Sequence, residues 1–189
     1  MALLGAGGIP LLDDGVRPPD ADNPEGYHEY EPVRRLLREA GWLEEARGHA
    51  VKVVVPLLRA LPVGLPCRVV LMRREIGEVV ASQERMLARR GAPSGGLSPG
   101  RVAGILSAQL DEALEWLRAR PSTPWLELDY HALVHAPAEP LAALAAFAGL
   151  RGPAERLAAV IRPSLHRQRG PTREGPAASA TGPSRGDPR

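Results

Sequence analysis

Two arginines follow directly after an apolar run, and their placement could hold an anion. The run Val69–Met72 ends at Arg73 and Arg74, and apolar residues then recur at helical spacings of three and four through Ile76–Leu87. In open α/β sheets, ligands bind beyond the carboxyl ends of the strands. A helix N-terminus favours anions through its unpaired N–H groups, and arginine offers a planar fork that fits phosphate or sulfate. The pattern therefore predicts an anion-binding site where this strand gives way to its helix.

The elements that must position this site alternate between strands and helices. Short apolar runs predict strands, whereas helical spacing, Pro in a first turn and Gly after a last turn predict helices. The predicted strands are Ala50–Val55, Cys67–Met72 and Trp125–Leu128. The predicted helices are Pro32–Ala40, Glu75–Arg90, Pro99–Arg120, one ending near Ala6, and two within Ala132–Ala148 and Ala154–Ile161. This alternation predicts an α/β fold with a parallel sheet and right-handed crossovers.

Length and composition narrow the class of protein. The 189 residues carry a net charge of +2, which suits one domain and is too weak to indicate nucleic-acid binding. Residues 1–170 are expected to form this domain, and residues 171–189, which lack apolar periodicity, a disordered tail. The single cysteine, Cys67, excludes an intramolecular disulfide and favours a reducing, cytoplasmic location. No apolar run approaches the ~20 residues of a membrane span.

Other kinds of chemical site lack their sequence signals. The histidines show no metal-ligand spacing with Cys67 or with each other, so no metal site is predicted. The chain also lacks the GxGxxG dinucleotide fingerprint and the serine nucleophile elbow. The basic pair at the end of the Val69–Met72 run therefore remains the leading candidate for chemistry.

The segment around Arg74 resembles the 3′-phosphate-binding pattern of the sulfotransferase family. In that pattern a strand is followed by Arg, with Ser eight positions later; this chain has Arg74 and Ser82, and Glu78 fills the acidic position between them. Further stretches fit bacterial members of the family: Asp22–Leu36, Leu126–Leu150 and Pro163–Gly170. The resemblance implies a three-layer sandwich in which a parallel sheet is flanked by helices, as in P-loop NTPases.

The same resemblance implies an activity. Sulfotransferases move a sulfuryl group from 3′-phosphoadenosine-5′-phosphosulfate (PAPS) to a hydroxyl or amine, here of a small-molecule or glycan acceptor, without a metal. Members also carry a first strand and a Gly-rich loop of the Pro-Arg-Ser-Gly-Thr kind that cradles the 5′-phosphosulfate, whereas Met1–Pro10 resembles the end of the helix after that loop. The chain is therefore expected to be N-terminally truncated, either because its start was assigned to an internal Met or because the gene is a remnant.

The family pattern assigns residues to the nucleotide. Arg74 and Ser82 match the positions that bind the 3′-phosphate, although Ser82 is alternatively an ordinary hydroxyl on a helix surface. Arg73 is expected to remain in solvent or to pair with Glu75 or Glu78 instead of the ligand. The basic loop that closes over the same phosphate is matched by residues that alternatively begin the tail: Arg167, Arg169 and Gly170.

The general base implied by the resemblance is a glutamate. Cytosolic sulfotransferases carry a His where this chain has Val54, but other branches use Glu, and Glu29 lies on a loop beside the expected donor site. His28 is the alternative base. Glu29 could instead complement the dipole of the helix predicted to begin at Pro32. Lys52, at the edge of a predicted strand, could neutralise a sulfate oxygen.

Two other classes of function remain open. A non-catalytic remnant of a sulfotransferase would retain a nucleotide- or partner-binding surface without turnover. A P-loop small-molecule kinase would need a Walker loop beside Asp and Ser/Thr residues that hold Mg²⁺, and the sequence shows no such loop.

Overall fold

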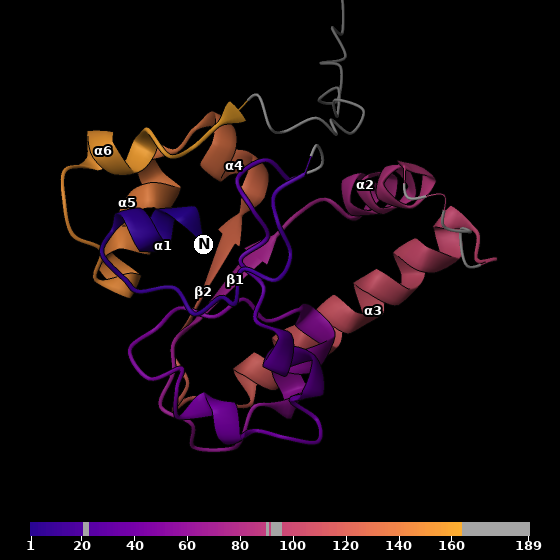
Figure 1. Cartoon of the computed structure of the whole chain (residues 1–189), viewed down its shortest axis with the longest axis horizontal. Helices are drawn as coiled ribbons and strands as arrows, with labels where there is room; N and C mark the ends of the chain where they lie inside the picture. Colours follow the sequence, from indigo (N-terminus) through magenta and orange to yellow (C-terminus); the bar gives the residue numbers. More distant parts are fainter. Residues whose placement is uncertain (21–22, 90, 92–95, 164–189) are drawn as a thin grey trace, which may run out of the picture.

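The protein has a mixed α/β fold built on a small parallel sheet (Figure 1). The structure is a computed structural model, and it describes residues 1–20, 23–89, 91 and 96–163. Within these ranges the sheet has two strands, β1 (Val69–Arg73) and β2 (Trp125–Asp129), which run parallel. The register places Val69 opposite Trp125 and Arg73 opposite Asp129. The predicted α/β class and both of these strands are confirmed.

The connection between β1 and β2 consists of two helices that extend away from the sheet (Figure 1). They are α2 (Ile76–Arg89) and α3 (Pro99–Arg118). Ser98 accepts a hydrogen bond from the Arg101 N–H (3.4 Å), and Pro99 occupies the first turn, so α3 begins where capping rules place it. Parallel strands need a long crossover, and these helices supply it.

The chain before β1 contains short helices in place of two predicted elements. Helix α1 (Ala2–Ala6) ends at glycine, as predicted. The predicted α-helix Pro32–Ala40 is wrong in type, because the Leu36 N–H bonds to the Val33 carbonyl three residues back. Three 3₁₀ helices occupy this region: Glu31–Arg35, Gly41–Leu43 and Val55–Ala60.

The strand predicted at Ala50–Val55 is also wrong. Its backbone makes a single parallel bridge, between Ala50 and Leu11, and Val55 already begins a 3₁₀ helix. The neighbouring segment is short and contains Pro10, which has no N–H to donate. A ladder needs a partner of matching length, and this segment lacks one among the described residues.

Three helices follow β2 where two were predicted: α4 (Tyr130–His135), α5 (Ala138–Ala148) and α6 (Ala154–Ala158). The Asp129 carboxylate accepts a hydrogen bond from the Ala132 N–H (2.7 Å) and so starts α4 immediately after the strand. Gly149 ends α5 with a left-handed φ of 71°. None of the helices in the described ranges is both long and apolar enough to cross a membrane.

The largest buried cluster joins the carboxyl-terminal half of α3 to β1 and to the 3₁₀ helices. Leu117 is the largest of its fully buried side chains, with 1% of its surface exposed. Its buried residues are Val33, Leu36, Trp42, Leu58, Leu61, Leu71, Ala113, Leu114 and Leu117. The cluster fixes α3 against the sheet and thereby positions the β1–α2 junction.

We expect Leu117→Ala to lower the free energy of unfolding by about 2–5 kcal/mol, because it leaves a cavity in this cluster. The measurement is urea unfolding followed by circular dichroism. Ile105→Ala, on the solvent side of the same helix (45% exposed), is the matched control and should change stability little. Equal losses in the two variants would show that Leu117 is not a core residue.

Candidate functional site

Arg74 lies just beyond the end of β1, where the sequence predicts an anion site. Its Nε atom donates to Glu78 Oε2 on α2 at 3.1 Å, and its guanidinium lies over the Tyr130 ring, 4.9 Å from the ring centroid. The Glu78 side chain is buried, at 7% exposure, whereas 26% of the Arg74 side chain is exposed. The guanidinium is therefore held between α2 and α4 while keeping access to solvent.

Ser82 lies on the same face of α2 as Glu78. Residues four apart on an α-helix are neighbours, so Ser82 is one turn beyond Glu78 and Met86 is one turn beyond Ser82. The structure thus brings Arg74 to the helix face that carries Ser82, as the sequence pattern requires. Ser82 is partly buried.

Arg73 points to a different partner from those expected. Its Nη1 atom lies 2.8 Å from Glu127 Oε1 on β2, whereas the sequence suggested Glu75 or Glu78. The hydrogen bond and charge of Glu127 raise the pKa of the Arg73 guanidinium above its ordinary value. Arg73 therefore crosslinks the two strands.

Some backbone N–H groups at the N-terminus of α2 already have hydrogen-bond acceptors within the protein. The Glu75 carboxylate accepts a hydrogen bond from the Glu78 N–H (3.0 Å). A side chain at Gly77 would collide with that carboxylate, because its Cβ would lie 2.9 Å from Glu75 Oε2. The anion site expected at this junction therefore depends on the Arg74 side chain more than on free helix N–H groups.

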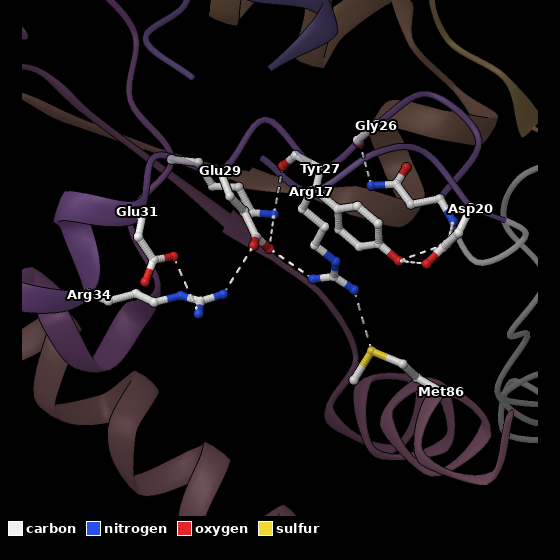
Figure 2. Close-up of polar contacts among 10 residues, drawn as sticks. Arg17, Asp20, Gly26, Tyr27, Glu29, Glu31, Arg34 and Met86 are labelled. Carbon is white, nitrogen blue, oxygen red and sulfur yellow. Dashed lines mark hydrogen bonds and ion pairs between the residues drawn. The ribbon is translucent and has the colours of Figure 1, made fainter. Parts of the chain in front are cut away.

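Glu29 lies at the centre of a second group of charges, with Arg17 and Arg34 on either side of it (Figure 2). Lys52 also approaches Glu29, and these four residues are called the Glu29 cluster. Arg17 Nη1 is 3.1 Å and Lys52 Nζ 3.6 Å from Glu29 Oε1. Arg34 Nη2 is 3.4 Å from the other oxygen, Oε2. Glu29 thus sits among cations, and sequence reasoning had identified two of the four members.

Tyr27 supports the two cations that share Oε1. The Arg17 guanidinium lies over the Tyr27 ring, 3.2 Å from its centroid, and Lys52 Nζ donates to the Tyr27 carbonyl oxygen at 3.0 Å. Arg17 Nη2 also reaches Met86 Sδ on α2, at 4.0 Å (Figure 2). The Glu29 cluster and Arg74 therefore contact the same face of α2, about two turns apart.

Arg17 could not be found from the sequence because its partners are remote in the chain. Met86 is 69 positions away, and Arg17 belongs to a loop without periodicity.

The loop that carries Glu29 has an unusual backbone at the preceding residue. His28 has a φ of 47°, the one positive value at a non-glycine position in the described part of the chain. Its Nδ1 atom lies 3.0 Å from Asp13 Oδ2, so the alternative base is itself engaged by a carboxylate. This contact and the turn at His28 direct the Glu29 side chain.

The structure leaves three predicted residues undescribed. Arg167, Arg169 and Gly170 lie outside the described residues, as does the predicted tail. Of the other predicted residues, Lys52 and Glu29 lie together, whereas Arg74 contacts Glu78, one turn before Ser82 on α2. No group of three potential metal ligands occurs among the residues whose positions are described.

Comparisons with family models, curated proteins and solved structures returned no match.

The Asp14 carboxylate holds the chain just after Glu29, where the 3₁₀ helix Glu31–Arg35 begins, and this contact predicts a pH dependence. Its carboxylate accepts hydrogen bonds from the N–H groups of Glu31 (2.6 Å) and Val16 (3.0 Å), which lower the Asp14 pKa below its ordinary value. A carboxyl with a lowered folded-state pKa stabilises the fold above its ordinary pKa. That contribution is lost as the pH falls through the lowered value.

We therefore expect Asp14→Asn to be less stable than the wild type near neutral pH, with the difference shrinking as the pH falls below the ordinary aspartate range. Urea midpoints for both proteins, measured from neutral to strongly acidic pH, test this expectation. A difference that stays constant over the whole range would show that the Asp14 charge does not contribute.

Proposed function

We propose that the protein belongs to the sulfotransferase family and acts on PAPS. Its fold would be a three-layer sandwich around a parallel sheet, and its reaction would move a sulfuryl group to a hydroxyl or amine of a small molecule or glycan. The observation that carries the proposal is the setting of Arg74. Its guanidinium lies at the carboxyl end of a parallel strand, between Glu78 and Tyr130, with Ser82 one turn further along α2.

The chemistry of the proposed reaction makes three demands on the residues. Sulfuryl transfer, like phosphoryl transfer, needs donor and acceptor in line, stabilisation of the charge on the transferred group, and removal of the acceptor proton. Arg74 and Ser82 would anchor the 3′-phosphate and so position the donor. Lys52 would stabilise negative charge on a sulfate oxygen.

Glu29 is the proposed acceptor of the proton, and its contacts favour a second candidate function. Its two oxygens already face Arg17, Lys52 and Arg34 within 3.6 Å. These cations occupy much of the space from which an acceptor hydroxyl would have to approach the carboxylate. A binding protein that holds the nucleotide without turnover is therefore the second candidate.

Binding of adenosine 3′,5′-bisphosphate, the desulfonated donor, tests the proposal. We expect calorimetry to detect binding that adenosine 5′-monophosphate does not match, because that compound lacks the 3′-phosphate. Arg74→Ala should weaken binding by about 1.5–3 kcal/mol, the range for a hydrogen bond to a charged group. Transfer from PAPS that persists with a metal chelator would separate this function from kinase chemistry.

The Arg74 variant needs a matched control, because it removes a cation from beside the buried Glu78 carboxylate. Glu78→Gln removes the negative charge at that position. Comparing nucleotide binding by Glu78→Gln and by the double variant Arg74→Ala/Glu78→Gln therefore measures the effect of losing Arg74 without the loss of stability that an altered ion pair would cause. If Glu78→Gln alone binds the nucleotide and the double variant binds it equally well, Arg74 does not contact the 3′-phosphate.

A further inference from the structure

The two cations that share Glu29 Oε1 have supports independent of Glu29. Arg17 is held against the Tyr27 ring, and Lys52 is held by the Tyr27 carbonyl oxygen (Figure 2). Removing the Glu29 carboxylate would therefore leave both cations close to their present positions. Preorganised charges of this kind bind a ligand with little cost of ordering.

The three cations around Glu29 differ in how they share their contacts among nearby carboxylates. Arg34 divides its interactions between Glu29 and Glu31, whose Oε2 atom lies 3.4 Å from Arg34 Nη1. Arg17 and Lys52 instead approach the same oxygen of Glu29. One oxygen of a monovalent carboxylate thus faces two cations.

We propose that Arg17 and Lys52 form a binding site for a tetrahedral oxyanion, and that the Glu29 carboxylate fills this site while no ligand is bound. The ligand class is a phosphate or sulfate group, free or at the end of an ester. A divalent tetrahedral group presents more charge and more oxygens to the two cations than one carboxylate oxygen does. Binding would displace Glu29 towards Arg34 and solvent.

The exposure of the Glu29 cluster fits exchange with a ligand. The side chains of Arg17, Glu29 and Lys52 are 26%, 28% and 38% exposed. An ion from solvent can therefore reach these side chains. They are also buried enough for the interaction energy between charges to be larger than it is for a fully exposed surface pair. Tyr27 closes one side, and its hydroxyl donates to Asp20, which keeps the ring in place (2.8 Å).

The inference deepens the proposed function, because a phosphate or sulfuryl group of PAPS belongs to this ligand class, and it rests on that function only for the source of the ligand. It adds to Glu29 a role in the unliganded protein that differs from the role of a general base during the reaction. A base that stood apart from the bound anion would leave anion affinity nearly unchanged when replaced by Gln. As a resident anion, it competes with the ligand, so its removal must strengthen binding.

The decisive variant is Glu29→Gln, tested with inorganic phosphate and inorganic sulfate at constant ionic strength. Thermal unfolding at increasing anion concentration gives an apparent dissociation constant for each protein. We expect the variant to bind both anions about tenfold more tightly than the wild type, a difference of about 1.4 kcal/mol. Adding Arg17→Gln to this variant should abolish the gain.

Glu31→Gln is the matched control. It removes the same charge two residues away, on a side chain that contacts Arg34, whereas Arg17 and Lys52 contact Glu29 and Tyr27. We expect it to change anion affinity less than twofold, since a general rise in positive charge acts weakly at physiological salt. An equal gain in Glu31→Gln and Glu29→Gln, or no gain in Glu29→Gln, would overturn the proposal.

A third variant covers the case in which Glu29→Gln does not fold. Glu29→Asp keeps the charge but shortens the side chain by one methylene, which draws the carboxylate away from Arg17. We expect a smaller gain in phosphate affinity than for Gln, and unchanged or weaker affinity would contradict the displacement of Glu29.

Two further arms identify the source of the ligand and separate the oxyanion site from nucleotide binding at Arg74. The increase in phosphate affinity caused by Glu29→Gln is measured again with saturating adenosine 3′,5′-bisphosphate. Loss of the increase assigns the site to the nucleotide 5′-phosphate, and its retention assigns the site to an anionic acceptor.

Adding Arg74→Ala/Glu78→Gln to Glu29→Gln should leave this increase in phosphate affinity intact. The oxyanion site is then established even if no nucleotide binds at Arg74, whereas loss of the gain in this background would overturn the Arg17–Lys52 assignment.

Discussion

The parallel pairing of β1 with β2 is the constraint on which the rest of the structure depends. Parallel strands present their carboxyl ends at one edge, so Arg74, just after β1, and Tyr130, just after β2, meet there. The pairing also requires a long crossover, and α2 and α3 supply it. Because α2 starts immediately after β1, its first turns are fixed beside Arg74, and Glu78 can hold the guanidinium.

Helix α2 organises the charges as well as the crossover. One of its faces carries Glu78, Ser82 and Met86, and these positions connect Arg74 at one end to Arg17 at the other. Cations from a strand end and from a distant loop thus gather along one helix. Two carboxylates, Glu78 and Glu29, hold them in place, so each carboxylate has a positional role whatever ligand the cations bind.

The sequence predicted what is local and missed what is remote. The positions of β2, α2 and α3 followed from periodicity and caps within each segment. The sequence suggested Glu78 as a partner of Arg73, whereas Glu78 contacts Arg74 and Arg73 reaches Glu127 on the neighbouring strand. The strand expected at Ala50–Val55 failed because a ladder depends on a partner elsewhere in the chain. The position of Arg17 depends on Tyr27 and Met86, which no spacing rule connects to it.

The uneven burial of α3 has a consequence for its dynamics. Its buried residues, Ala113, Leu114 and Leu117, all lie in the last six positions, about 20 Å from the first turn. The first turns pack beside α2, where Pro99, Gly100 and Ala103 line a shallow hollow of small side chains. Amide protons there can exchange with solvent through local fraying, whereas those around Leu117 exchange only when the core opens. One continuous helix therefore combines a firmly held carboxyl-terminal half with an amino-terminal half whose backbone opens more readily.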